Sequence, residues 1–282
     1  MGRATERSSQ HRRVSGAARV TPARLSGYFR FAIRNPRPGM MPGESDRMQQ
    51  SAPDNDLYRR FLEGRAEAPQ IHKWHHYFDV YQAALAPFRG KPVTMLEIGV
   101  QRGGSLRMWQ EYLGPEARIF GMDIDPATAA HALPGSKVFV GDQADAGFLR
   151  AALAEMGRPD IVLDDGGHTA RQQITTFEVL YPAMRLPGAY LIEDTHTAFW
   201  GGTFADDPKG RSIYDIAFAV CRRLQEWTGR PNAMRRLGIP PAERPPADPV
   251  SEICRTTESV SFHDSMILFR RAERPEPWHE VR

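Results

Sequence analysis

Short apolar runs alternate with longer amphipathic stretches along most of the chain. Five of these runs predict buried strands, because each is bounded by turn residues and is too short for a helix. They are residues 93–98, 118–123, 137–140, 160–164 and 188–192. The stretches between them carry apolar residues at helical spacing. Such alternation is typical of a parallel sheet with helices on both faces.

Two further apolar runs end the pattern. Ser259–Phe262 and Ser265–Phe269 flank His263 and Asp264, which predicts an antiparallel hairpin at the sheet edge. We therefore expect an α/β fold, with a doubly wound, mostly parallel seven-stranded sheet and a C-terminal antiparallel hairpin. Asp145 is predicted to cap the helix after the third strand.

The composition divides the chain into segments. Residues 1–56 are rich in Arg, Ser, Gly and Pro without a sustained apolar period, so we expect a disordered basic tail there. Residues 57–92 predict a helical lead-in, residues 93–271 the main domain, and residues 272–282 a loose tail. The Arg-rich start also resembles an organelle transit peptide, although a dispensable tail is the simpler interpretation.

Charge and cysteine content narrow the class of protein. Residues 1–38 carry +8, from nine Arg and one Glu, which leaves −5 for the rest of a chain whose net charge is +3. A mildly acidic body argues against nucleic acid as a partner. No window reaches the ~18 apolar residues of a membrane helix. Cys221 and Cys254 lie far apart, so no disulfide framework is predicted and a cytoplasmic location is expected.

The lead-in holds an aromatic and histidine-rich stretch at residues 71–81. Its Trp74, Phe78 and Tyr81 stand at i, i+4 and i+7, which predicts an amphipathic helix packed against the sheet with the histidines at its surface. A role of the histidines in metal binding, or at the mouth of a site, stays open. These histidines are His72, His75 and His76.

A glycine turn follows the first predicted strand. Glu97 stands on the strand, Gly99 and Gly103 let the backbone turn sharply and approach a ligand, and Ser105 is predicted to cap the next helix. In parallel α/β sheets this turn lies at the carboxyl end of the first strand, where a helix N-terminus faces a cofactor. A purely structural turn is an equally simple reading of this one motif.

Acids also follow the second and third predicted strands. Asp123 is the first acid after the second strand, where a ribose diol is usually held. Asp142 and Gln143 follow the third strand, and a carboxylate with an amide at that point suits the edge of an adenine ring. Local capping is the alternative for both carboxylates.

The fourth and fifth strands each end in an acid pair. Asp164 and Asp165 are followed by two glycines and His168, and Glu193 and Asp194 follow the next strand. Because neighbouring parallel strands end at the same edge, Asp165, Glu193 and Asp194 are expected to meet there. Such hard oxygen ligands suit Mg²⁺ or a similar ion.

Five ordered motifs together resemble the S-adenosylmethionine (SAM) methyltransferases of class I, specifically the metal-dependent sugar O-methyltransferases of the macrolide type and the related group named after cephalosporin hydroxylase. The D-D-G-x-H and I-E-D-T-H motifs are the specific ones, within a resemblance covering about residues 70–270. The motifs are Glu97–Ser105, Gly121–Pro126, Gly141–Gln143, Asp164–His168 and Glu193–His196.

The resemblance implies roles for individual residues. It implies Asp165, Glu193 and Asp194 as ligands of Mg²⁺ or a similar divalent cation, and His168 as the catalytic base. The implied reaction is methyl transfer from SAM to a hydroxyl of a sugar in a glycan, glycolipid or glycosylated natural product. The residues expected to bind SAM are Glu97, Gly99, Gly103, Ser105, Asp123, Asp142, Gln143 and Asp164.

Two other functions stay open at this point. A catechol-type O-methyltransferase also uses a metal beside SAM, and a non-catalytic SAM-binding module would share the fold. The acceptor, a small molecule or glycan, is not identified by sequence, nor is the hydroxyl position. A homo-oligomer is possible. Whether residues 1–47 belong to the mature protein also stays open.

Overall fold

The computed structural model describes residues 53–63 and 69–282. The predicted tail therefore lies outside the described residues except for its last few positions. Before the sheet come helices α1 (Asp56–Glu63) and α2 (Tyr77–Leu85). The strands are β1 (Thr94–Ile98), β2 (Arg118–Asp123), β3 (Val138–Val140), β4 (Ile161–Asp164), β5 (Gly188–Ile192), β6 (Thr257–His263) and β7 (Met266–Arg271).

Helices separate the strands as the apolar pattern predicts. They are α3 (Gly104–Leu113), α4 (Ala146–Met156), α5 (Ala170–Ala183), α6 (Ile213–Arg223), α7 (Ala233–Leu237) and α8 (Glu252–Thr256). Short 3₁₀ turns η4 (Thr195–Phe199) and η5 (Gly202–Phe204) follow β5.

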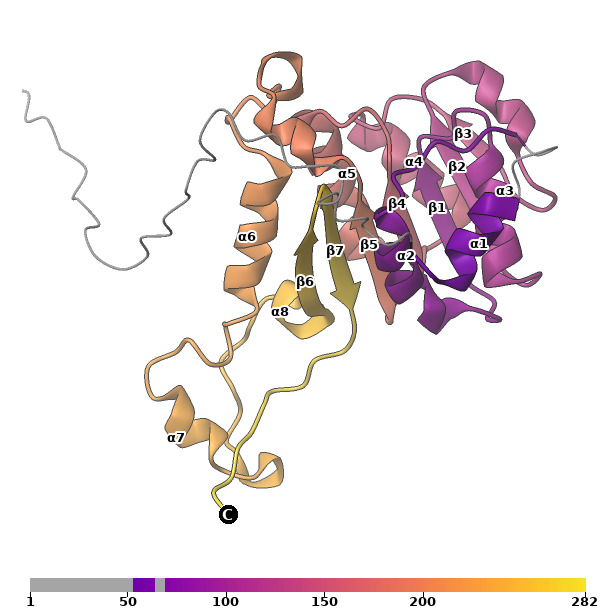
Figure 1. The fold of residues 1–282 in the computed structure, drawn as a ribbon. Helices are drawn as coiled ribbons and strands as arrows, with labels where there is room; N and C mark the ends of the chain where they lie inside the picture. Colours follow the sequence, from indigo (N-terminus) through magenta and orange to yellow (C-terminus); the bar gives the residue numbers. More distant parts are fainter. Residues whose placement is uncertain (1–52, 64–68) are drawn as a thin grey trace, which may run out of the picture. The chain divides into compact units, whose positions relative to one another are not determined.

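The seven strands form one sheet in the order β3-β2-β1-β4-β5-β7-β6 (Figure 1). The first five run parallel, and β7 is antiparallel to both β5 and β6. This confirms the predicted fold class, including the C-terminal hairpin. The chain reverses the direction of strand addition after β3, so the carboxyl ends of β1 and β4 lie next to each other at the point where ligands bind in such sheets.

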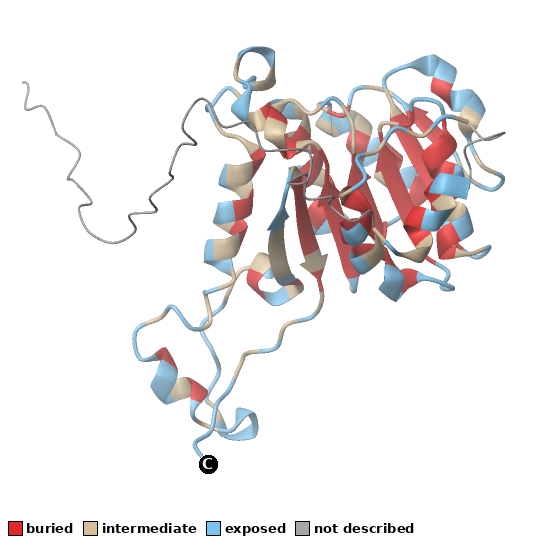
Figure 2. Ribbon diagram, viewed as in Figure 1, coloured by how far each residue is buried: buried red, intermediate tan, exposed pale blue. Residues whose placement is uncertain are grey.

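The sheet is buried on both faces except at its edge strand β6, most of whose residues are partly or fully exposed (Figure 2). Helices α1, α2 and α3 pack on one face, where Phe78 and Trp109 contact the strands. Helices α4, α5 and α6 pack on the other face, through residues such as Leu149 and Phe177. Because both faces are covered, each parallel strand reads as a continuous apolar run rather than an alternating one.

Helix caps were partly predictable. Asp145 caps α4 by accepting hydrogen bonds from the backbone N–H groups of Gly147 and Phe148, as expected. The prediction for Ser105 was wrong, because α3 begins at Gly104 and Gly103 occupies the N-cap with a φ of +73°. Glycine adopts this left-handed conformation without the Cβ strain of other residues.

The lead-in differs from its prediction at one aromatic position. Helix α2 begins only at Tyr77, so the helical spacing does not extend back to Trp74, which is 54% exposed. Phe78 and Tyr81 are buried, as predicted. His75 contacts the Tyr58 hydroxyl across 2.9 Å.

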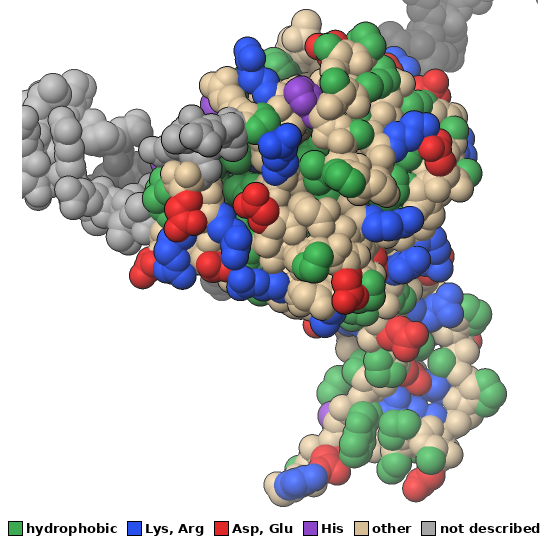
Figure 3. Space-filling model, turned by 90° about the vertical axis from the view of Figure 1, so that its right-hand side faces the viewer, with side chains coloured by type: hydrophobic (Ala, Val, Ile, Leu, Met, Phe, Trp, Pro, Cys, Tyr) green, Lys and Arg blue, Asp and Glu red, His purple; other side chains and the backbone are tan. Residues whose placement is uncertain are grey.

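The C-terminal residues, expected to be loose, contact α7. Arg236 makes two hydrogen bonds to Glu276, of 2.6 and 2.9 Å, and the backbone N–H of His279 donates to Leu237. No helix in the described part of the chain is long and apolar enough to cross a membrane. On the face shown in Figure 3, basic and acidic side chains are interspersed.

Candidate active site

A cavity of about 210 Å³ lies at the carboxyl ends of the first strands. Gly99, Asp123, Asp142 and Gln143 line it, together with Asp165. Four of the eight predicted cofactor residues therefore share one cavity. Gly99 has a φ of +90°, and a Cβ there would lie 1.9 Å from the carbonyl oxygen of Asp165, so the turn after β1 requires glycine.

Glu97 lies beneath this cavity rather than in its wall. Its side chain is fully buried, and Ser105 donates a 2.7 Å hydrogen bond to Oε2. Burial raises the pKa of Glu97 above its usual value, although the nearby Lys73 ammonium opposes that shift. The predicted cofactor residues Glu97 and Ser105 thus form a buried pair that joins β1 to α3.

Asp123 holds the glycine turn. Its Oδ2 accepts hydrogen bonds from the backbone N–H groups of Val100 and Gln101, at 2.8 and 3.0 Å. Its Oδ1 accepts from Asp125. Because a carboxylate has about four acceptor positions, these bonds leave room for a ligand hydroxyl. The predicted ribose contact stays a prediction.

Gln143 and Asp164 connect the loops after β3 and β4. The Gln143 side-chain amide donates to Asp164 Oδ1 at 3.0 Å, and its Oε1 accepts from the backbone N–H of Gly167 at 2.9 Å. Asp164 is buried, and burial raises the pKa of its carboxyl. Much of the hydrogen-bonding capacity of this predicted adenine contact is therefore used within the protein. Asp142 Oδ1 accepts from the backbone N–H of Ala144.

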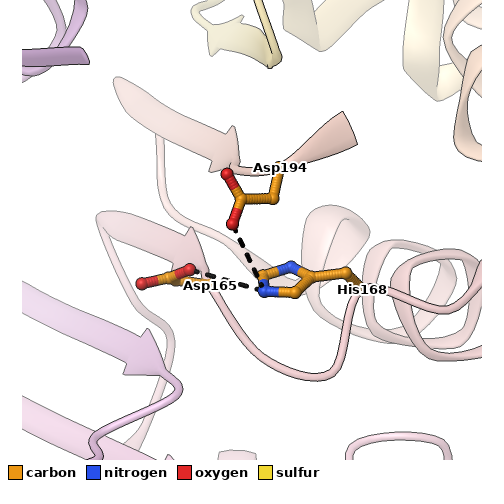
Figure 4. Close-up of side chains that lie close together, drawn as sticks. All are labelled: Asp165, His168 and Asp194. Carbon is orange, nitrogen blue, oxygen red and sulfur yellow. Dashed lines mark ion pairs between the residues drawn. The ribbon is translucent and has the colours of Figure 1, made fainter. Parts of the chain in front are cut away.

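Asp165, His168 and Asp194 lie together at the carboxyl edge of β4 and β5 (Figure 4). His168 Nε2 is 3.7 Å from Asp165 Oδ1 and 3.6 Å from Asp194 Oδ2. One ligand atom from each residue lies within 4.8 Å of the other two. Two carboxylate oxygens at this spacing fit a divalent cation, and the imidazole nitrogen is near enough either to bind that cation or to act as a base beside it.

The backbone around this group is strained. His168 and Asp194 have φ angles of +58° and +50°, values that non-glycine residues seldom adopt. The hydroxyl of Thr197 lies 2.9 Å from the carbonyl oxygens of both residues and shares its one hydrogen between them. Such conformations cost on the order of 1–3 kcal/mol each and persist where the surroundings impose them, as they do at functional sites.

Glu193, the third predicted metal ligand, faces a different partner. Its Oε1 accepts a 2.9 Å hydrogen bond from Lys73 Nζ, and the same ammonium lies 2.5 Å from Asp165 Oδ2 and 3.5 Å from Glu97 Oε1. Burial disfavours the charge of Lys73, but the three carboxylates outweigh it and hold its pKa well above the usual value. Burial also raises the pKa of Glu193.

Lys73 and Tyr77 are the site residues that the sequence analysis missed. The Tyr77 hydroxyl donates a 2.6 Å hydrogen bond to Asp194 Oδ1. Burial, reinforced by this bond, raises the pKa of Tyr77 above its usual range. Both residues lie in the lead-in, about a hundred positions before their partners. The only signal for them in the sequence is a lysine and a tyrosine four residues apart at the start of α2.

Exposed aromatic side chains follow the second acid pair. Phe199 is 76% exposed and Trp200 62% exposed, both near the end of η4. The Trp200 ring also contacts His196, with ring centroids 4.9 Å apart. The glycine pair Gly201 and Gly202 comes next.

Strand order, cavity position and the glycine turn together define a class. The chain has the fold of the class I SAM-dependent methyltransferases. A solved structure with this fold is the MycE methyltransferase of the mycinamycin pathway, in complex with Mg and SAH. It superimposes with a TM-score of 0.62 at 26% identity, over 80% of this chain and 57% of that one.

Curated relatives carry the similarity further. A tetracenomycin 3'-O-methyltransferase from Streptomyces olivaceus, named for a 2-methoxy-rhamnosyl substrate, is 39% identical over 169 residues, 55% of this chain and 42% of that protein. The rhamnosyl tetracenomycin 2'-O-methyltransferase of the same organism is 32% identical over 211 residues, 71% of this chain and 51% of that protein. The chain thus spans about half the length of these relatives or less. No family model matches it.

Proposed function

We propose that the protein is a SAM- and Mg²⁺-dependent O-methyltransferase that methylates a hydroxyl of a sugar, in a glycan, glycolipid or glycosylated natural product. The grouping of Asp165, His168 and Asp194 beside the glycine-turn cavity carries this proposal. The similarity to relatives named as methyltransferases of rhamnosyl compounds supports the choice of a sugar acceptor.

SAM would occupy the cavity at the ends of β1, β2 and β3. When bound, it supplies a methyl group on a positively charged sulfonium. We assign Gly99 to close approach of the ligand, Asp123 to the ribose and Asp142 to the adenine side, since all three line the cavity. Gln143, Asp164 and the Glu97–Ser105 pair then act by fixing the loops, because their polar atoms contact one another or nearby protein groups.

Asp165 and Asp194 would hold the divalent cation with one oxygen each. A cation at this place lowers the pKa of a sugar hydroxyl that it coordinates. Glu193 lies outside this group, and because its Oε1 faces the Lys73 ammonium, only its Oε2 would be left for the cation. The donor set is rich in hard oxygen atoms, which suits Mg²⁺.

His168 would take the proton of the acceptor hydroxyl. Its Nε2 faces both aspartates, so a hydroxyl held between them lies within reach of the ring. Transfer of the methyl group to the hydroxyl oxygen would be an in-line displacement, in which a C–O bond forms as the C–S bond breaks and the thioether sulfur leaves. For such a step the protein chiefly supplies position and an electrostatic field. The strained loops at His168 and Asp194 fix that geometry before the substrate arrives.

Calorimetric titration tests the cofactor and metal parts. We expect SAM to bind the parent chain with Mg²⁺ or chelator present, and the Mg²⁺ signal to disappear in Asp165→Asn while SAM still binds. Asp248→Asn, which removes an exposed carboxylate next to Arg230, should leave both signals unchanged. Absence of SAM binding in every condition contradicts the cofactor assignment.

Turnover with glycosides and catechols tests the reaction. His168→Ala should lower turnover by about 10²–10⁴-fold without changing SAM affinity, as loss of a general base does. A preference for catechols would favour the catechol-type enzyme, and SAM binding without turnover of any acceptor would favour a binding module. Loss of SAM binding in His168→Ala would show that His168 supports the fold instead.

A further inference from the structure

Asp165 and Asp194 each divide their two carboxylate oxygens between a protein side chain and the shared centre. Asp165 Oδ2 lies 2.5 Å from Lys73 Nζ, while Oδ1 faces His168. Asp194 Oδ1 accepts the Tyr77 hydroxyl at 2.6 Å, while Oδ2 faces the same His168 nitrogen. Figure 4 shows these two oxygens directed at the imidazole ring from the ends of two neighbouring strands.

Both donors come from one short segment of the lead-in. Tyr77 is the first residue of α2, and Lys73 precedes it by four positions. Both side chains are buried, with 2% of the Lys73 side chain and none of Tyr77 exposed. A carboxylate that is held at one oxygen by a buried donor cannot rotate freely, so the direction of its second oxygen is set.

We propose that Lys73 and Tyr77 are positioning residues that orient the metal-binding oxygens of Asp165 and Asp194. This inference rests on the proposed function, because it assumes that these two aspartates bind the cation. Groups that hydrogen-bond to metal ligands fix their orientation, and losing one typically costs about 10–100-fold in metal affinity. The lead-in would then be a part of the metal site rather than only a cover for one sheet face.

The tyrosine allows a clean test. Its ring packs in the core on one face of the sheet, so Tyr77→Phe keeps the buried ring and removes only the hydroxyl. That hydroxyl has one hydrogen, and its 2.6 Å contact with Asp194 is shorter than its 3.3 Å contact with the carbonyl oxygen of Ser265. The main loss is therefore the bond to the carboxylate.

A matched control lies near the start of β5, at the opposite end of that strand from the metal site. Tyr181 is buried and its hydroxyl contacts Thr257 Oγ1 at 2.7 Å, so Tyr181→Phe also removes one buried hydroxyl contact. Among the described residues, its hydroxyl makes no hydrogen bond to a candidate metal ligand. Both variants should lose similar thermal stability, which separates a general weakening of the fold from an effect on the metal site.

The experiment is titration of the full chain with Mn²⁺, followed by electron paramagnetic resonance of free and bound ion, without SAM or acceptor. We expect about 10-fold weaker Mn²⁺ binding in Tyr77→Phe and parent affinity in Tyr181→Phe. Equal affinity in the parent and a folded Tyr77→Phe overturns the inference. Absence of Mn²⁺ binding by the parent overturns the metal-dependent function as well, and so distinguishes the two failures.

Lys73→Met adds a spectroscopic test. Without the ammonium, Asp165 is free to turn, so we expect the resonance of bound Mn²⁺ to change shape as its ligand geometry changes. A spectrum identical to that of the parent would remove Lys73 from the inference. If this variant does not fold, Tyr77→Phe still decides the proposal.

Discussion

The two sides of the site differ in what holds their carboxylates. After β2 and β3, Asp123 and Asp142 accept hydrogen bonds from backbone N–H groups of the surrounding loops. After β4 and β5, Asp165 and Asp194 contact side chains from the distant lead-in. Backbone donors are present wherever the chain turns, whereas a side-chain donor depends on one residue. The metal side should therefore be more sensitive to single substitutions than the cofactor side.

Lys73→Met should have the largest effect on stability. The buried Glu97 and Glu193 and the partly exposed Asp165 would lose their shared cation, and removing one partner of a buried ion pair costs about 3–5 kcal/mol. Urea unfolding of the metal-free chain measures the loss. Lys137→Met is the matched control, because Lys137 pairs with Glu155 at the surface, where such pairs contribute ~0–1 kcal/mol. Equal losses in the two variants would mean that the buried cluster is not balanced by Lys73.

Gly99→Ala tests the point where the two sides meet. The added Cβ would collide with the carbonyl oxygen of Asp165, and φ is +90°, so strain and displacement of the loop add to about 3 kcal/mol. Gly90→Ala is the control, since Gly90 also has a positive φ but no atom lies within 4 Å of its would-be Cβ. That variant should lose only ~1–2 kcal/mol. Similar losses would show that backbone conformation, not close approach, requires glycine at residue 99.

Features set by near neighbours in the sequence were predictable. The apolar runs predicted the strands and the fold class. Thr169 with Gln172 forms the capping box of α5 that their spacing suggests. The glycine turn was recognisable because the positive φ values at Gly99 and Gly103, four positions apart, favour glycine. Prediction was less accurate where it depended on the first residue of a helix. Trp74 lies before α2, and Ser105 lies inside α3 instead of capping it.

Long-range contacts explain what was missed. Lys73 meets Asp165 across 92 positions and Glu193 across 120, and no local pattern encodes such a meeting. Gln143 was predicted to face a ligand, yet it shares its amide with Asp164, because parallel strands bring their loops together at one edge. The sequence therefore shows which residues reach the edge, but not which of them bond to one another.

Gln143→Leu probes the cofactor side. It leaves the buried Asp164 carboxylate without its amide donor and the Gly167 N–H without its acceptor, which should cost about 2–3 kcal/mol. Chemical unfolding measures the loss of stability, and SAM titration measures any change in cofactor affinity. Gln110→Leu removes a glutamine whose bonds go to backbone carbonyl oxygens near the end of α3, and should cost less. A loss as large as that of Lys73→Met would contradict the difference between the two sides.

Asp207→Asn gives the smallest expected effect and depends on pH. Hydrogen bonds from the Arg211 side chain lower the pKa of Asp207 to about 2, below the ~3.9 of an unfolded chain. Its stabilisation is therefore present above pH ~4 and is lost as the pH falls through about 2. The melting temperatures of parent and variant should differ at neutral pH and converge toward pH 2.

Thermal unfolding between pH 2 and 7 checks this convergence, with Asp54→Asn as a control for an exposed ion pair. A gap that persists to the lowest pH would mean that Asp207 acts through its shape rather than its charge. Asp207 and Arg211 are only four residues apart and form a local ion pair. Substituting one member of such a pair should change the free energy of unfolding only slightly. Lys73 and its carboxylates are the same types of group, but the Lys73 side chain is buried and its partners come from distant parts of the sequence. Burial leaves the carboxylates without another partner for their charge, so the fold depends more on this contact.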